Sequence, residues 1–109
     1  MTRLAEKKCV PCRGGVSALT GKAIEELRSK LDGGWSVVEE HHLTKTYPFK
    51  DFAQALAFVN RVGSVAEAEG HHPDIYLSWG SVRIDIWTHK AGGLTENDFI
   101  LAAKADQVV

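Results

Sequence analysis

A strictly alternating stretch in the second half of the chain is the feature that most restricts its fold. The apolar residues Val82, Ile84 and Ile86 alternate there with Arg83, Asp85 and Trp87. Because successive side chains of a strand point to opposite faces, a strand over residues 82–88 would bury one face and leave the other partly polar. Residues 74–79 pair with it as a hairpin through Gly80-Ser81. This pattern predicts an antiparallel sheet with one covered face.

Three helices are predicted from capping residues and apolar periodicity. Thr20 is the expected N-cap of a first helix, which a Gly-Gly pair ends. Asp51 begins an Asp-x-x-Gln capping box that opens a long helix, and this helix ends between residues 62 and 69. Thr95 and Asp98 form another capping box, which opens the terminal helix.

A further hairpin completes the predicted sheet. Residues 35–49 contain two runs rich in β-branched and aromatic side chains, separated by a polar bend at residues 39–42. The element order is therefore αββαββα, which predicts an α+β fold with a four-stranded antiparallel sheet and helices packed on one face. We expect one domain over residues 19–109, preceded by a flexible N-terminal tail over residues 1–18.

Charge and hydropathy exclude several classes of protein. Thirteen Lys and Arg residues against fourteen Asp and Glu residues leave a net charge of −1. Sequence-independent electrostatic binding of nucleic acid is therefore not expected. The most apolar run, FAQALAFV at residues 52–59, is far too short to span a membrane. The charged start of the chain has no apolar leader pattern, and we expect a cytoplasmic protein.

Five histidines are many for a chain of 109 residues, and three of them occupy the ends of predicted elements. His71 and His72 lie between a helix-closing glycine and Pro73, and His89 ends the last strand. If the second hairpin pairs, these three imidazoles meet at one edge of the sheet. Imidazole suits proton transfer near neutral pH because its pKa is about 6.5. The alternatives are ordinary surface histidines and a metal site to which Glu67 adds a carboxylate; adjacent residues such as His71 and His72 rarely bind one ion.

Three other features are better explained by structure than by chemistry. His41 and His42 lie in the polar bend, where surface histidines are common. Cys9 and Cys12 form a single Cys-x-x-Cys, which we interpret as two reduced thiols in the tail, with zinc binding as the alternative. Asp98 follows His89 closely, but its place in a capping box already accounts for it.

The stretch EGHHPDIYLSWGSVRIDIWTHKAGGLTENDF resembles the signature of the pterin-4a-carbinolamine dehydratases, also called 4a-hydroxytetrahydrobiopterin dehydratases. Its parts are a His-His-Pro, a strand with the alternation V-x-I-x-I, a Thr-His and a Gly-Leu-Thr-Glu-x-Asp helix start. The resemblance extends upstream through GGW at residues 33–35 and YPFKDFAQALAFVNRV at residues 47–62. The cysteine-containing tail and the pair at residues 41–42 lie outside it.

The resemblance implies a hydro-lyase that removes water from a 4a-hydroxytetrahydropterin to give quinonoid dihydropterin, with no cofactor and no metal. It implies that His71 and His89 are general acids and that His72 holds the pterin and acts as base. The other implied site residues are Pro73, which fixes the histidine pair, Glu67, which orients an imidazole, and the pocket walls Trp35, Trp87 and Thr88, with Asp98 as a structural residue nearby. A small polar residue is common in the family where this chain has Trp87.

The resemblance also implies partners. Family members form dimers or dimers of dimers, so we expect a homodimer or a homotetramer in which edge strands join. Recycling of tetrahydropterin would place the chain in the pathway of an aromatic amino acid hydroxylase. The alternative function is a non-catalytic protein-binding role, as an assembly factor or a coactivator-type dimerisation factor. Three retained histidines favour catalysis, because docking alone would need none of them.

Overall fold

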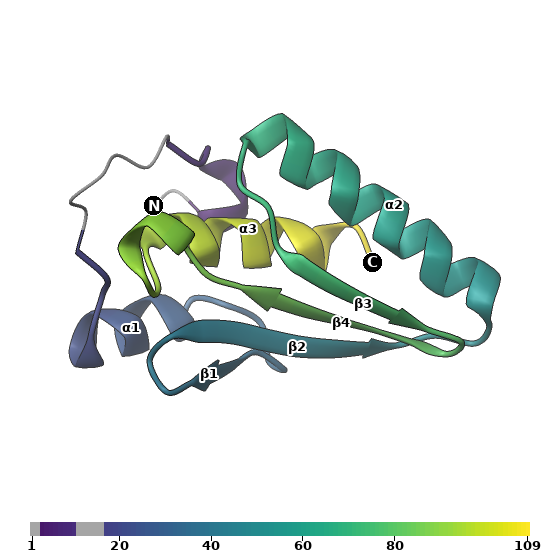
Figure 1. Cartoon of the computed structure of the whole chain (residues 1–109), viewed down its shortest axis with the longest axis horizontal. Helices are drawn as coiled ribbons and strands as arrows, with labels where there is room; N and C mark the ends of the chain where they lie inside the picture. Colours follow the sequence, from purple (N-terminus) through teal and green to yellow (C-terminus); the bar gives the residue numbers. More distant parts are fainter. Residues whose placement is uncertain (1–2, 11–16) are drawn as a thin grey trace.

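An antiparallel sheet, covered on one face by two helices, forms the body of the molecule (Figure 1). The computed structural model describes residues 3–10 and 17–109. The elements in chain order are η1 (Leu4–Glu6), α1 (Gly21–Arg28), β1 (Ser36–Val38), β2 (His42–Pro48), α2 (Phe52–Glu69), β3 (Asp74–Ser78), β4 (Ser81–Ile86), η2 (His89–Ala91) and α3 (Glu96–Gln107). The predicted α+β class and the order αββαββα are confirmed, and two short 3-10 helices, η1 and η2, are added to them.

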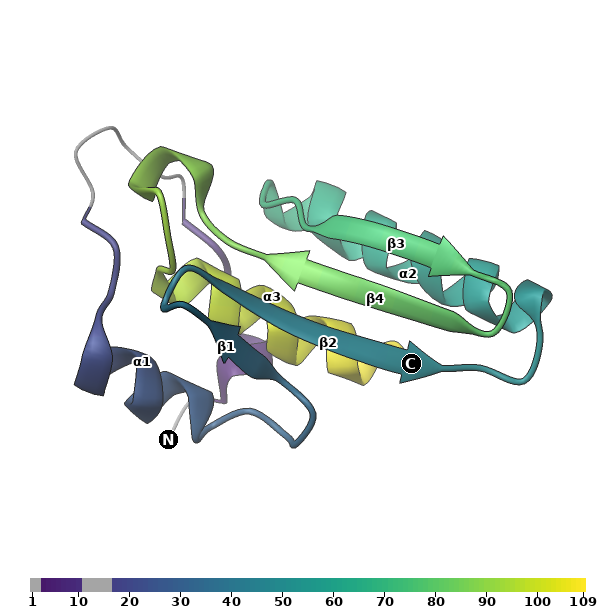
Figure 2. The ribbon, with the colours of Figure 1, turned by 60° about the horizontal axis from the view of Figure 1, so that its bottom comes forward.

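The sheet has the strand order β1-β2-β4-β3, and each pair of neighbouring strands is antiparallel. Val82, Ile84 and Ile86 are fully buried, as their alternation predicts. They pair across the sheet with residues of β2, so that Ile86 lies opposite Leu43 and Val82 opposite Tyr47. Helices α2 and α3 pack behind this face, whereas no helix in the described part of the chain covers the opposite face (Figure 2).

Helix α2 leads the chain to the loop that carries two of the histidines. Its N-cap, Asp51, accepts a hydrogen bond from the backbone N–H of Gln54 at 2.8 Å, as the capping box predicts. The helix continues to Glu69 and stops because Gly70 adopts a left-handed conformation with φ of 66°, which glycine does at little cost. His71 therefore follows directly from a sharp helix end.

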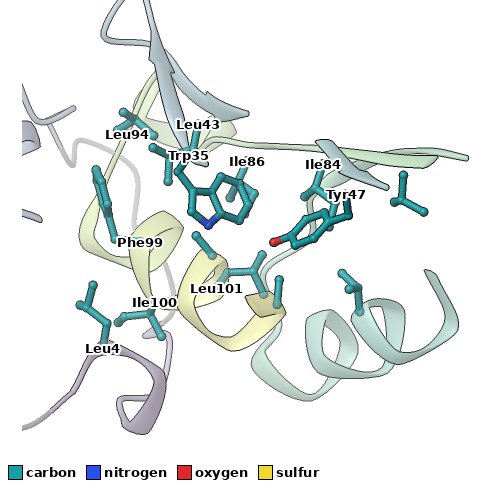
Figure 3. Packing of buried hydrophobic residues seen from close by; sticks show 14 of the residues in the cluster. Leu4, Trp35, Leu43, Tyr47, Ile84, Ile86, Leu94, Phe99, Ile100 and Leu101 are labelled. Carbon is teal, nitrogen blue, oxygen red and sulfur yellow. The ribbon is translucent and has the colours of Figure 1, made fainter. Parts of the chain in front are cut away.

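At the C-terminal end of α3, one carboxylate ties the helix to the sheet. Asp106 accepts hydrogen bonds from Trp35 Nε1 at 3.0 Å, from Lys45 Nζ at 2.8 Å and from Tyr47 Oη at 2.6 Å. Burial and the neighbouring Asp106 carboxylate raise the pKa of Tyr47 well above its usual range, so Tyr47 remains a hydrogen-bond donor. Figure 3 shows Trp35 and Tyr47 extending from the sheet into the core beside Leu101.

Residues 3–10, which we call the N-terminal strap, pack on the domain. Leu4 is only 5% exposed and belongs to the hydrophobic core, and η1 packs against α3 (Figure 1). The sequence pattern places residues 3–10 in the tail, because a three-residue helix has no periodicity that a pattern could show, and the boundary expected at residue 19 stays a prediction. Cys9 lies in the strap, whereas Cys12 lies outside the described residues. The interpretation of Cys9 and Cys12 as two reduced thiols therefore stays a prediction.

The turn between β1 and β2 uses an unfavourable backbone conformation. Glu39 and Glu40 have φ angles of 51° and 55°, and the N–H of His41 donates to the carbonyl of Val38 at 2.8 Å. Residues 39–41 join the strands, since Val38 pairs with His42, and the two positions with positive φ favour Asn or Gly because other residues are strained there. The polar bend expected at residues 39–42 is present, but its sequence does not relieve this strain.

We predict that the double variant Glu39→Asn/Glu40→Gly is more stable than the wild type by about 1 kcal/mol, because each new residue tolerates positive φ better than Glu. Urea denaturation measures the change in the free energy of unfolding. The matched control is Glu25→Asn/Glu26→Gly in α1, which should lower stability by about 1 kcal/mol because glycine is unfavourable inside a helix. A hairpin variant that unfolds at a lower urea concentration than the wild type would contradict the strain argument.

Candidate functional site

The loop before β3 and the loop after β4 lie side by side at one end of the sheet and border a cavity of about 510 Å³. Six residues singled out in the sequence line this cavity: His71, His72, Pro73, Trp87, Thr88 and His89. The antiparallel pairing of β3 with β4 causes this convergence, because the first residues of β3 lie opposite the last residues of β4. The three imidazoles therefore meet at one edge of the sheet.

His71 is held by a fully buried carboxylate. Its Nε2 lies 2.6 Å from Oδ1 of Asp98, and the two side chains are 11% and 0% exposed. An ionised carboxylate can only accept, so Nε2 donates to it. Nδ1 of His71 is then the nitrogen that can exchange a proton with a ligand, and the ring orientation is set by the carboxylate.

Asp98 also bonds to the start of α3 and to the segment that follows β4. Its Oδ2 accepts from Thr88 Oγ1 and from the backbone N–H of Thr95, both at 2.8 Å. The capping box predicted for Thr95 and Asp98 is present. The sequence pattern predicts the cap but not the contact with His71, because no local spacing links residues 71 and 98.

His72 points to a different environment from its neighbour. Its side chain is 58% exposed, and its Nε2 lies 3.7 Å from Oε1 of Glu67, whose side chain is 81% exposed. Water screens such a pair, so it contributes little to the orientation of the ring. Glu67 borders a separate hollow beside α2 that His72 and Pro73 share. Asp98 is within hydrogen-bond distance of a cavity imidazole, whereas the orienting role implied for Glu67 stays a prediction.

His89 packs on the indole of Trp87. The ring centroids are 4.0 Å apart with an angle of 24° between the planes, which is a stacked arrangement. Trp87 also contacts His41, at 4.3 Å between centroids, and His41 Nδ1 lies 3.1 Å from His42 Nδ1. The turn between β1 and β2 therefore reaches the cavity wall through His41, a contact that the sequence analysis did not predict.

Trp35 is the implied pocket wall that the structure places elsewhere. It is 4% exposed, lies in the core, and donates its N–H to Asp106 rather than facing the histidines. The physical reason is strand alternation: Trp35 falls on the same side as Val37, toward the helices, whereas Trp87 continues the open face of β4. Trp35 therefore does not line this cavity, and its implied role as a pocket wall stays a prediction.

Across residues 3–10 and 17–109, no group of three or more His, Cys, Asp or Glu side chains is arranged to hold a metal ion. Within the same ranges, no helix combines the length and the apolar character needed to cross a bilayer.

The sheet, its helical cover and the histidine-lined cavity define an α+β protein with a site suited to proton transfer. A family model described as pterin 4 alpha carbinolamine dehydratase matches residues 17–108. The chain belongs to this family, a family of hydro-lyases, which confirms the resemblance found in the sequence.

Two bacterial relatives match the chain over almost its whole length. A protein of Rubrobacter xylanophilus is 54% identical over 108 residues, covering 99% of this chain and 100% of the relative. A protein of Rickettsia canadensis is 51% identical over 109 residues, covering 100% of both. Both carry the provisional name pterin-4-alpha-carbinolamine dehydratase.

Two solved structures share the fold. A transcriptional coactivator/pterin dehydratase from Brucella melitensis is 31% identical and has a TM-score of 0.78, covering 84% of this chain and 98% of that one. A pterin dehydratase-like protein identified as a RuBisCO assembly factor in the alpha-carboxysome is 25% identical and has a TM-score of 0.59, covering 69% of this chain and 88% of that one. The fold is thus found in proteins described by different functions.

We predict that Asp98→Ala lowers the free energy of unfolding by about 3 kcal/mol, because it leaves buried donors without their acceptor. Asp98→Asn keeps the shape and one acceptor oxygen, and should lose less. Asp32→Ala, at an exposed loop position, is the control and should change stability by less than about 0.5 kcal/mol. Urea denaturation of the three variants tests this, and equal stability of the Asp98→Ala and Asp32→Ala proteins would refute the role given to Asp98.

Proposed function

We propose that the chain removes water from a 4a-hydroxytetrahydropterin to give quinonoid dihydropterin, and so supports the recycling of tetrahydropterin. The observation that carries the proposal is that His71, His72 and His89 line one cavity, with His71 held against buried Asp98. Family membership and the names of the relatives support the same reaction. The cavity of about 510 Å³ is of the size that small ligands use, roughly 300–1,000 Å³.

The reaction needs an acid at the hydroxyl on carbon 4a and a base at the ring nitrogen bonded to that carbon. The hydroxyl on carbon 4a leaves as water once it receives a proton, because hydroxide is a poor leaving group. The neighbouring ring nitrogen loses its proton, and its electron pair forms the new carbon–nitrogen double bond. One proton is taken up and one is released, so histidines can complete the step without a cofactor.

The proposed roles are those that the resemblance to the family implies, and the environment of each imidazole supports them. His71 and His89 are the general acids, serving opposite faces of the pterin, and His72 holds the pterin and acts as base. The carboxylate of Asp98 stabilises the positive charge that His71 carries as an acid. The stacked indole of Trp87 holds the ring of His89 and offers a flat wall to a planar ligand. His72 is more exposed than His71, which lets it pass a proton to water.

A second candidate function is a non-catalytic role in assembly or as a coactivator-type dimerisation factor. The observation that favours it is that two proteins of the same fold are described in these terms. The open face of the sheet offers a surface for a partner (Figure 2). The conjunction of three imidazoles and a buried carboxylate at one cavity supports catalysis, because a docking surface has no use for it.

We predict that the purified protein accelerates the dehydration of a synthetic 4a-hydroxytetrahydropterin. His72→Ala and His89→Ala should each lower kcat/KM by about 100-fold, the scale for the loss of one proton-transfer group. His42→Ala is the matched control, because His42 does not line the cavity, and it should retain the wild-type rate. Absence of any acceleration by the wild type would overturn the enzyme proposal, and wild-type rates in both cavity variants would overturn the assignment of roles.

We further propose that the chain forms a homodimer or a homotetramer. Strands β1 and β3 are the two edges of the sheet, and no strand among residues 3–10 and 17–109 pairs with their outer sides. Pairing with another copy would satisfy their outward backbone groups. Light scattering should give two or four times the chain mass of 11.9 kDa, and a mass of one chain at micromolar concentration would contradict the prediction.

A further inference from the structure

The first half of the N-terminal strap is fixed to the core and to the later turns of α3. The side chain of Leu4 is buried among core residues. One residue on, the carbonyl of Ala5 accepts a hydrogen bond from Lys104 Nζ at 2.9 Å. These two contacts therefore fix the first half of the strap against the core and α3.

The second half of the strap is fixed by buried or half-buried polar side chains from α2 and α3. The N–H of Cys9 donates to Glu69 Oε1 at 2.8 Å. The N–H of Val10 donates to Asn97 Oδ1 at 3.0 Å, and Asn97 Nδ2 donates to the carbonyl of Val10 at 2.7 Å. Asn97 is only 5% exposed, so one buried amide satisfies both backbone polar groups of Val10.

These bonds hold Val10 beside the histidines. Val10 lines the cavity together with His71, His72 and His89, although its side chain is 66% exposed. Its position is thus set by the backbone contacts and not by burial of its own methyl groups. Asn97 precedes Asp98 in the first turn of α3, so the same turn positions the strap and the ring of His71.

We propose that Val10 is an apolar wall of the substrate site and that the strap determines how tightly the planar ligand is bound. The proposal rests on the proposed function, since it takes a pterin as the ligand. A ligand that lies against Val10 removes the exposed methyl groups from water and gains binding energy in proportion to the area covered. The family model matches residues 17–108. Val10 precedes this range, so the proposed wall lies outside the part of the chain that the family model matches.

A purely structural role for the strap makes a different prediction. Leu4 and Lys104 would then explain the strap completely, and changes at Val10 would affect neither stability nor binding. If Val10 is a wall, its replacement changes binding while stability stays constant, because the exposed side chain contributes little to the core.

The first experiment compares Val10→Ala and Val10→Asp with the wild type in dehydration of the synthetic 4a-hydroxytetrahydropterin, and in binding of 7,8-dihydropterin by calorimetry. We expect the KM and the dihydropterin Kd of Val10→Ala to rise by about 5-fold, with kcat within about 2-fold, because a contact made equally in the ground state and the transition state has been lost. Val10→Asp should weaken binding further. Lys8→Ala, an exposed change in the same strap, is the matched control and should behave as the wild type.

The second experiment tests the anchor without measuring activity. Burial and the nearby Glu69 carboxylate raise the pKa of Cys9 to about 12, so its thiol reacts slowly while the strap is docked. In a Cys12→Ser background, Asn97→Ala should release the end of the strap, increase the rate of Cys9 alkylation by about 10-fold or more, and raise the KM in parallel. The Val10 variants should leave the alkylation rate unchanged.

The outcomes separate the two proposals. An active wild type with wild-type KM and Kd in both Val10 variants overturns the strap proposal and leaves the proposed function intact. A wild type that neither dehydrates the substrate nor binds dihydropterin overturns the proposed function, and the strap proposal falls with it. Weaker binding in the Val10 variants, with the Lys8→Ala protein unaffected, supports the strap as a wall of the site.

Discussion

The buried carboxylate of Asp98 links three segments of the chain at the end of the sheet where the cavity lies. One of its oxygens contacts His71, and the other accepts from Thr88 and from the backbone of Thr95. A carboxylate with no exposed surface is tolerated only when its oxygens find donors. The loop after α2, the end of the β4 region and the start of α3 must therefore come together for the chain to fold. The same requirement brings the histidines to one place.

The parts of the fold that could be predicted are those with short-range signals. Alternation at every second residue showed which face of β4 is buried, and caps three residues apart located the starts of α2 and α3. The meeting of His71, His72 and His89 followed from the hairpin that joins their strands. Each of these inferences needed only neighbouring residues or one turn.

The parts that could not be predicted depend on contacts between distant residues. The role of Asp98 at His71 has no local signature, and neither has the burial of Leu4 against α3. The bend at Glu39 and Glu40 was expected from its polarity, but a left-handed backbone there would have been indicated only by Asn or Gly. Trp35 was assigned through a resemblance between sequences, which carries no information about which way the indole turns.

One half of the sheet, β1 and β2, comes from the first half of the chain, and the other, β4 and β3, comes from the second half. Strands β2 and β4 pair at the centre, where residue 43 lies opposite residue 86, and α2 lies between them in the chain. Closing so long a segment is entropically costly and slows folding. The contacts around Asp98, in contrast, all join residues within 71–98, which also include the three cavity histidines. The polar framework of the site is thus contained in the second half of the chain, whereas the centre of the sheet joins the first half to the second.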